Sequence, residues 1–343
     1  MPLVRIKPRT IVLITTTRCT AACEGCCFGC NPKQGRTMTY EEMVSYIDKC
    51  LDAYPDSIRR LSLTGGECML LKKDIDKRIK YGKDKGLESA MVSNAFWASS
   101  YDVAFKTLRR LKRCGLASIS FSTGEDHAQF VPPENVINAA IASANLGLTT
   151  DVRVESRFGL SRVWEKLTTN TELNALQQQG KLVVSGNPWM YYHNYGKKQR
   201  EWQTTFYPSK ANHNCQSLFN EFIINPYGEV YACCGIGMCK IPQLRLGNIN
   251  NEPVSTIHER AFDDFLKIWL FTEGPQSILK YANKKGCQKF KSHTMHMCDM
   301  CRTVFTDKNI IPIIEDNFDE IASLQMSLYN FMAKDINEKR SRH

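Results

Sequence analysis

The sequence lacks a long hydrophobic run. The apolar stretch Ile11 to Ile14 is far too short for a signal-peptide core or a membrane span, and no later stretch comes close. This absence excludes a membrane-embedded protein and predicts a cytoplasmic one. Internal repeats and low-complexity segments are also absent, so the 343 residues are free to form an ordinary core, with room for two domains.

A compact basic block with interleaved aromatic residues is also missing. The formal net charge is +10, but the basic residues are spread over expected helix faces, such as Arg109 to Arg113, and over the tail Lys339 to His343. A chain that follows nucleic acid usually concentrates such residues along one groove. The charge therefore predicts a solvated surface with a mild attraction for acidic partners, and nucleic acid is not favoured as a partner.

Cysteine, by contrast, is abundant. The chain has 15 cysteines and no export signal, which favours metal ligation or redox chemistry over a disulfide framework. Five of them fall within residues 19–30, directly after the β-branched run 11–17. The first three, Cys19, Cys23 and Cys26, have the spacing Cys-x3-Cys-x2-Cys. Three thiolates leave one position of a metal centre open, which is typical of catalytic rather than structural sites.

The first 187 residues alternate apolar strands with amphipathic helices. The expected strands are 11–17, 60–64, 90–93, 117–122, 150–155 and 181–185, and the expected helices are 39–54, 74–85, 101–114, 133–147 and 161–178. Six such units in succession predict an α/β fold with a parallel sheet and helices outside it. A length of about 185 residues is too short for a complete eight-unit barrel.

The remaining chain has a different pattern. Residues 188–212 lose periodicity and are expected to be a linker, and residues 213–302 are expected to form a small domain. Within it, strand 222–224, the turn 225–228 and strand 229–231 predict a hairpin that brings Cys215 close to Cys233. Cys298 and Cys301 follow as a Cys-x2-Cys pair. Residues 303–343 are expected to form a helix with a basic tail, with Ile321, Leu324, Leu328 and Phe331 on one face.

The residues alone leave two kinds of metal open. Cys27 or Cys30 could complete a four-thiolate zinc site at the first motif. Cys215, Cys233, Cys298 and Cys301 could hold structural zinc as well as iron, and His293 and His296 lie beside Cys298. A zinc-stabilised nucleic-acid-binding protein without catalysis is therefore an alternative, but it leaves the strand-helix alternation unexplained.

The Cys-x3-Cys-x2-Cys loop after a first strand, followed by Gly65-Gly66-Glu67 after the second strand, resembles the radical S-adenosylmethionine (radical SAM) superfamily. The resemblance implies a partial six-unit barrel over residues 1–187. It implies a 4Fe-4S cluster on Cys19, Cys23 and Cys26 whose open iron binds SAM, and a 5'-deoxyadenosyl radical formed with one electron from a donor such as flavodoxin or ferredoxin. Where the family usually has a bulky residue before its third cysteine, this chain has Gly25, and Phe28 is expected to cover the adenine instead.

The same resemblance assigns SAM contacts to the ends of the strands, where parallel sheets place their chemistry. Gly65, Gly66 and Glu67 are expected to hold the SAM amino group. The further candidates for the ribose and carboxylate are Ser93, Asn94, Ser120, Ser122, Arg153 and Glu155, of which Ser120 and Arg153 are favoured. His127 lies on the loop after the fourth strand and is a candidate to face the substrate, with an ordinary loop histidine as the alternative.

The pattern Cys215-x12-Gly228-x4-Cys233 with the later Cys298-x2-Cys301 resembles the twitch domain, a shortened SPASM domain of radical SAM enzymes. It implies one fully ligated auxiliary 4Fe-4S cluster on these four cysteines, suited to electron transfer. The cysteines left over are Cys27, Cys30, Cys50, Cys68, Cys114, Cys234, Cys239 and Cys287. Cys50 and Cys114 are expected to be buried apolar residues within helices.

The resemblance to peptide maturases predicts an enzyme that modifies a peptide or protein, such as a ribosomal precursor, by epimerisation or crosslinking. Cys234 and Cys239 follow a cluster ligand on a glycine-rich loop and are the candidates for a hydrogen-atom donor, with Cys234 preferred. The first strand begins near Ile11, so no N-terminal leader-binding module is expected. The alternative within the superfamily is a dehydrogenase of a small-molecule alcohol.

Overall fold

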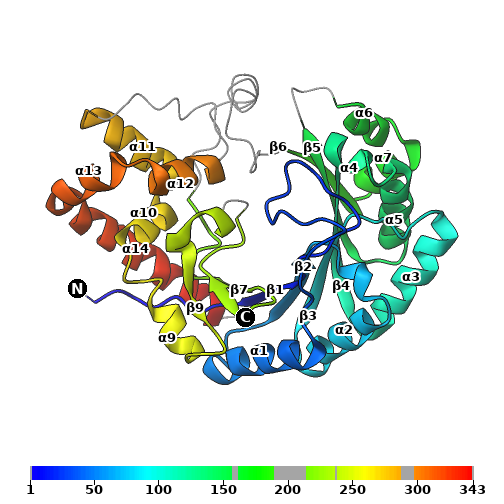
Figure 1. Cartoon of the computed structure of the whole chain (residues 1–343), viewed down its shortest axis with the longest axis horizontal. Helices are drawn as coiled ribbons and strands as arrows, with labels where there is room; N and C mark the ends of the chain where they lie inside the picture. Colours follow the sequence, from blue (N-terminus) through cyan, green and yellow to red (C-terminus); the bar gives the residue numbers. More distant parts are fainter. Residues whose placement is uncertain (1, 157–160, 189–213, 236–237, 287–296, 342–343) are drawn as a thin grey trace.

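One nine-stranded sheet forms the centre of the computed structural model, which describes residues 2–156, 161–188, 214–235, 238–286 and 297–341 (Figure 1). Its strands are β1 Thr10–Thr16, β2 Arg60–Gly65, β3 Glu88–Ser93, β4 Leu116–Gly124, β5 Thr149–Ser156, β6 Leu182–Pro188, β7 Glu221–Ile224, β8 Glu229–Tyr231 and β9 Arg245–Asn248. Their order in the sheet is β6-β5-β4-β3-β2-β1-β7-β8-β9. Strands β1 to β7 are parallel, and β8 and β9 run antiparallel to their neighbours.

Helices cover the outer face of the parallel part of the sheet (Figure 1). They are α1 Tyr40–Ala53, α2 Asp74–Asp84, α3 Tyr101–Cys114, α4 Glu125–Ala128, α5 Pro133–Asn145, α6 Arg162–Thr168 and α7 Thr171–Gln178. The later helices are α9 Val254–Glu259, α10 Phe265–Thr272, α11 Pro275–Lys284, α12 Met297–Thr306, α13 Ile310–Asp316 and α14 Phe318–Ser341. Short 3-10 turns are η1 Cys68–Leu71, η2 Met238–Lys240 and η3 Pro242–Leu244. None of the helices among the described residues is both long enough and apolar enough to span a bilayer.

The two faces of the sheet differ in polarity. Leu61, Leu63 and Phe121 point to the helix-covered face and are buried. Ser120 and Asp151, paired across β4 and β5, point to the other face and are only half-buried. Side chains alternate between the two faces along a strand. The helix-covered, convex face therefore supplies the core, and Ser120 and Asp151 place polar side chains on the other, concave face. The α/β class with a parallel sheet is therefore confirmed, and the described strands form an open sheet with β6 and β9 at its edges.

Most elements of the first 187 residues match their predicted positions, and one expected helix is wrong. Thr39 caps α1 through the predicted capping box with Glu42, and Gly115 ends α3 in the left-handed conformation. The expected helix 161–178 is divided into α6 and α7. Asn170 causes the division, because its side chain accepts a hydrogen bond from Leu173 N–H and starts a new helix there.

The hairpin predicted in the second domain joins the sheet of the first. Strand β7 pairs in parallel with β1, so that Glu221 lies opposite Thr10 and Ile224 opposite Leu13. Strands β8 and β9 extend the same sheet, and β9 was not predicted. The predicted linker 188–212 lies outside the described residues apart from Pro188, where β6 ends. A continuous ladder of backbone hydrogen bonds therefore connects the two cysteine-containing regions.

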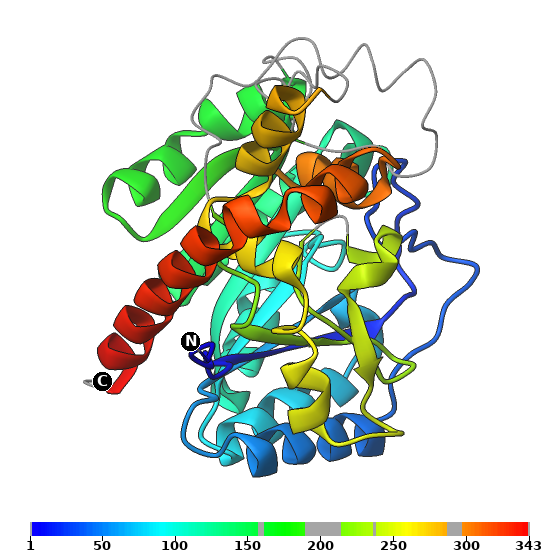
Figure 2. The same ribbon diagram turned by 90° about the vertical axis from the view of Figure 1, so that its left-hand side faces the viewer.

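The C-terminal helix α14 was predicted correctly, but its buried face was not. Leu324 and Phe331 are 67% and 72% exposed, whereas Gln325 and Asn330 are buried. The buried amide groups have partners: Gln325 accepts from Thr272 Oγ1 at 2.6 Å, and Asn330 Oδ1 accepts from Val4 N–H at 2.7 Å. Helix α14 thus packs along α10 and the N-terminal segment, crossing the molecule diagonally in Figure 2.

Candidate functional site

The five-cysteine loop leaves the carboxyl end of β1 and folds back on it. Thr17 N–H donates to Arg36 O at 2.9 Å, and Cys19 N–H donates to Asn31 O at 3.2 Å. These bonds close residues 17–36 into a loop, which Figure 1 shows in dark blue beside the upper ends of the strands. Cys19, Cys23 and Cys26 are all half-buried on it, so the three predicted cluster ligands lie on one short loop.

The sulfurs of this loop accept backbone hydrogen bonds. Ala21 N–H donates to Cys19 Sγ at 3.4 Å, and Cys30 N–H donates to Cys26 Sγ at 3.3 Å. Hydrogen bonds from the Cys30 thiol and from nearby backbone N–H groups hold the pKa of Cys26 below its usual value, because they stabilise the thiolate. Among the three predicted ligands this applies to Cys26 alone, because burial raises the pKa of Cys19 to about 11 and also raises that of Cys23. Phe28 is half-buried and packs against the hydrophobic core.

Gly65 and Gly66 place the end of β2 directly against this loop. Gly66 N–H donates to Thr16 O at 2.7 Å, and Glu67 N–H donates to Arg18 O at 2.9 Å. A Cβ atom on Gly66 would lie 1.9 Å from the carbonyl oxygen of Arg18. The glycines are therefore required by the close approach of two backbones, one of which leads into Cys19.

Glu67 is completely buried, and its carboxylate connects β2 with β3. It accepts hydrogen bonds from Met69 N–H at 3.0 Å, Ser93 Oγ at 2.9 Å and Asn94 N–H at 2.7 Å. Burial raises the pKa of Glu67 to about 7, and the three donors oppose that rise. The Asn94 side chain then reaches the cysteine loop, with Nδ2 at 3.1 Å from Thr20 Oγ1 and 3.7 Å from Cys19 Sγ.

A second pair of carboxyl groups lies on the other side of the loop. Asp126 Oδ2 accepts from Gly25 N–H at 3.3 Å, and Glu155 Oε2 accepts from Asp126 N–H at 3.0 Å. Both residues are buried, and their charges act with burial to raise the pKa of Cys23. Glu155 was a predicted SAM contact, but Asp126 was not singled out. Its only sequence signal is a position just after the carboxyl end of β4.

The remaining predicted SAM contacts lie on the concave face. Ser120 Oγ donates to Asp151 Oδ2 at 2.9 Å, and Arg153 Nε donates to the same oxygen at 2.8 Å. Ser122 lies opposite Arg153 in the β4–β5 register and is half-buried. His127 does not face an open surface, since it is buried on α4, and burial lowers its pKa to about 4.

The second group of cysteines surrounds a small apolar cavity. Its lining residues are Cys215, Cys233, Gly235, Met238, Ile241, Leu244, Leu270, Pro275, Met297, Cys298 and Cys301. Cys215 N–H donates to Leu270 O at 2.9 Å, which fixes the first cysteine against α10. The hairpin brings Cys233 to the cavity, and α12 supplies the last two. The structure thus brings the four predicted auxiliary ligands together around one space with an apolar lining.

Within the described residues, no three His, Cys, Asp or Glu side chains converge tightly enough to bind a single metal ion. In a 4Fe-4S cubane each thiolate binds a different iron, so its ligands are spread around the cluster. His293, His296 and Cys287 lie outside the described residues. Cys50 and Cys68 are buried in the core, and Cys114 packs against it.

The two candidate hydrogen donors lie in different places. Cys234 lies beside Glu221 and Ser217, with 3.4 Å between its sulfur and Ser217 Oγ. Glu221 is level with Thr10, the first residue of β1, about 20 Å along the strand from the cysteine loop. Cys239 is exposed to solvent but lies near that loop: partial desolvation of its thiol raises its pKa to about 11, and the nearby charge of Cys26 adds to the rise. Cys239 likewise adds to the burial effect that raises the pKa of Cys27.

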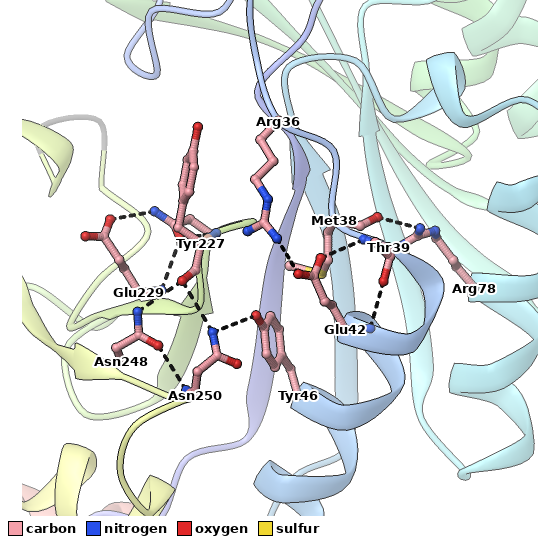
Figure 3. A network of polar contacts seen from close by, with 11 residues as sticks. Arg36, Met38, Thr39, Glu42, Tyr46, Arg78, Tyr227, Glu229, Asn248 and Asn250 are labelled. Atoms are coloured by element: carbon pink, nitrogen blue, oxygen red, sulfur yellow. Dashed lines mark hydrogen bonds and ion pairs between the residues drawn. The ribbon is translucent and has the colours of Figure 1, made fainter.

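A polar network joins the exit of the cysteine loop to the hairpin (Figure 3). The Arg36 guanidinium pairs with Glu42 of α1 and lies over the Tyr227 ring, 5.3 Å from its centroid. Asn250 Nδ2 donates to Tyr46 OH at 3.2 Å, which links the β9 end to α1. The turn predicted at 225–228 thus contacts the cysteine loop through Arg36.

Comparison with known families identifies both regions. The family model described as Radical SAM superfamily matches residues 13–150, and the model described as Iron-sulfur cluster-binding domain (SPASM) matches residues 215–303. The first implies a 4Fe-4S cluster with SAM, and the second implies auxiliary iron-sulfur ligation. These matches favour iron over the zinc alternative for a chain with this cysteine pattern.

Two relatives with low sequence identity match nearly the whole chain. YydG of Bacillus subtilis (strain 168), described as a peptide biosynthesis protein, is 20% identical over 331 residues, covering 91% of this chain and 98% of YydG. The structure of anSMEcpe with bound AdoMet and the Cp18Cys peptide has a TM-score of 0.54 at 13% identity, covering 95% of this chain and 99% of that one. The fold is thus similar to that of anSMEcpe over nearly its full length. The chain is an iron-sulfur enzyme that combines a radical SAM domain with a SPASM domain.

Proposed function

We propose that this enzyme removes a hydrogen atom from a peptide substrate and returns another from the thiol of Cys239, which inverts an α-carbon. In this proposal Cys19, Cys23 and Cys26 hold the radical-site cluster, and Cys215, Cys233, Cys298 and Cys301 hold one auxiliary cluster. When bound, the first cluster supplies the electron that cleaves SAM to a 5'-deoxyadenosyl radical. A peptide substrate is supported by the relatives, since YydG is described as a peptide biosynthesis protein and anSMEcpe was solved with a peptide.

The groups around the cysteine loop fit a bound SAM molecule. SAM carries an ammonium, a sulfonium and a carboxylate, and it needs both anionic and cationic partners. Asp126 and Glu155 are buried carboxyl groups beside Cys23 and would attract the ammonium. Arg153 is exposed on the concave face, where its guanidinium can pair with the SAM carboxylate. Glu67 already accepts three protein hydrogen bonds, so we assign it to holding the β2 and β3 ends in place.

The position of Cys239 is the observation that favours epimerisation over the other reactions of a peptide radical. A radical at the α-carbon can be quenched from the opposite face only by a hydrogen donor near the site where SAM is cleaved. Cys239 lies close enough to Cys26 and Cys27 for their charges to interact, whereas Cys234 lies beside Glu221 at the far end of β1. We therefore prefer Cys239 to Cys234, the residue favoured by the sequence alone. The thiyl radical left on Cys239 then needs one electron and one proton to become a thiol again.

The test is an anaerobic reaction in deuterium oxide with a small precursor-like peptide encoded beside the gene, with reduced flavodoxin or ferredoxin as the proposed electron donor. The wild-type enzyme should form 5'-deoxyadenosine and place one deuterium at an α-carbon. Cys239→Ala should still form 5'-deoxyadenosine but should lose deuterium incorporation. Cys234→Ala and the control Cys114→Ala on α3 should retain it.

Other outcomes would redirect the proposal. Loss of incorporation only in Cys234→Ala would return the donor role to that residue. Stoichiometric two-electron oxidation without deuterium would indicate a crosslinking enzyme or a dehydrogenase. A protein that forms no 5'-deoxyadenosine with any peptide would contradict the peptide substrate itself.

A further inference from the structure

Helix α10 contains a lysine that is almost completely buried. Lys267 is 4% exposed, and its Nζ lies 2.5 Å from Asp264 Oδ2. Asp264 also caps the same helix, since its Oδ1 accepts from Leu266 N–H at 2.9 Å. Removing an ammonium group from water is costly even when it is paired, so a buried lysine calls for an explanation beyond packing.

The helix that carries Lys267 forms one wall of the auxiliary cysteine site. Leu270 lines the apolar cavity between the four cysteines, and its carbonyl oxygen accepts from Cys215 N–H. Lys267 precedes Leu270 by three residues, which places both on the same face of α10. Lys267 therefore leaves α10 on the side that carries Leu270, and its ammonium group is held one turn earlier by Asp264.

The electrostatics of Cys301 agree with this placement. Burial raises the pKa of Cys301, and among the charges that act on it Lys267 opposes the rise more strongly than Asp264 adds to it. The charges of both members of the pair therefore reach Cys301, and they act on it with opposite signs. The apolar lining of the cavity leaves little water to screen these charges.

We propose that Lys267 raises the reduction potential of the auxiliary iron-sulfur cluster, and that Asp264 limits this effect. The proposal rests on the ligation by Cys215, Cys233, Cys298 and Cys301 proposed above. Reduction adds one negative charge to a cluster, and a nearby cation in a medium of low dielectric constant stabilises that charge. The pair would set the cluster at a potential from which it can exchange electrons with a substrate or thiyl radical.

The experiment uses the full-length chain with Cys19, Cys23 and Cys26 replaced by Ala, so that only the auxiliary cluster titrates. Its midpoint potential is measured by redox titration followed by electron paramagnetic resonance. Lys267→Met, which keeps the length of the side chain but removes its charge, should shift the potential downward. Asp264→Asn, which keeps the helix cap, should shift it upward. Lys267→Arg and the distant control Lys166→Met should leave it nearly unchanged.

Opposite shifts distinguish a charge effect from general damage, because a loosened site would move both variants in the same direction. The proposal is wrong if the two variants shift the potential in the same direction, or not at all, at unchanged iron content. The ligand assignment would survive that result. A triple variant that binds no iron would instead overturn the assignment of the four cysteines, and this proposal with it.

Discussion

The two cysteine sites of this enzyme are built on opposite principles. The first places Cys19, Cys23 and Cys26 on a loop whose sulfurs accept backbone hydrogen bonds, with the carboxyl groups of Glu67, Asp126 and Glu155 nearby. The second places four cysteines around a cavity with apolar walls. Three cysteine donors leave one coordination position of a metal centre open for a further ligand, whereas four donors fill it. The difference agrees with the proposed roles, in which the first site binds and cleaves SAM and the second holds an electron.

The largest effect is expected when one cysteine ligand is removed from either site, because each substitution should disable one site and leave the other intact. Cys23→Ala should abolish 5'-deoxyadenosine formation and remove about half of the bound iron, because the remaining cluster is independent. Cys301→Ala should remove a similar amount of iron while 5'-deoxyadenosine formation persists. Iron analysis and an anaerobic SAM cleavage assay measure both. If either variant lost all of its iron, the two sites would not be independent.

The next effect concerns the contact between Gly66 and the cysteine loop. Gly66→Ala would bring a Cβ atom to 1.9 Å from the Arg18 carbonyl oxygen, and no side-chain rotation can relieve an overlap between backbones. We expect a loss of about 3 kcal/mol in the free energy of unfolding, measured in urea. The first cluster should load poorly while the second stays intact. Gly180→Ala is the comparison: its Cβ would meet no neighbouring atom, so only the left-handed backbone there (φ +68°) should cost stability, about 1 kcal/mol.

A smaller effect is expected on acidification. Burial lowers the pKa of His258 to about 4, and its Nδ1 lies 2.9 Å from Tyr54 OH, between α9 and the end of α1. In the unfolded chain His258 binds a proton near pH 6.5, but in the folded protein it does so only near pH 4. The free energy of unfolding therefore falls as the pH drops from about 6.5 to about 4. His258 should contribute about 2 kcal/mol of this loss between pH 7 and pH 5. His258→Gln should therefore flatten the pH dependence of unfolding, and an unchanged slope would contradict the assignment.

The smallest effect tests the network between the sites. Arg36→Ala removes the contact with the Tyr227 ring and the ion pair with Glu42, which should cost about 0.5–1 kcal/mol of stability. Arg36 ends the cysteine loop, so its removal should weaken the affinity for SAM. The iron content of the auxiliary cluster should stay nearly unchanged. Equilibrium binding of SAM to the reconstituted enzyme measures this. Arg110→Ala, which breaks an ion pair with Asp76 far from both sites, is the matched control.

Local patterns allowed much of this architecture to be predicted. The cysteine loop, the capping box at Thr39 and the strand-helix alternation depend on residues close together in the chain, and the structure agrees with them. The pairing of β7 with β1 aligns residues more than 200 positions apart in the chain. The periodicity of a single strand gives no information about such a distant partner or its register. The buried face of α14 was mispredicted because Gln325 and Asn330 become acceptable in the core only through distant partners, Thr272 and Val4.

The site itself was predicted unevenly for the same reason. Cysteine spacing identified the candidate ligands, since a cluster demands thiolates at short intervals. The three bonds to Glu67, the role of Asp126 and the separation of Cys234 from Cys239 arise only when strand ends and loops meet. Such contacts join segments that are distant in the sequence and that come together only once the strands are ordered in the sheet.

The pairing of β7 with β1 also bears on electron transfer. Tunnelling rates depend steeply on the gap between donor and acceptor. In this enzyme the ladder from Thr10 to Leu13 joins β1, which leads to the first cysteines, to the hairpin that precedes Cys233. A slip of a single residue in that ladder would change the gap by about 3.3 Å and turn the hairpin side chains to the other face. The register of this pairing therefore sets how far the first cysteine loop lies from the segment that follows the hairpin.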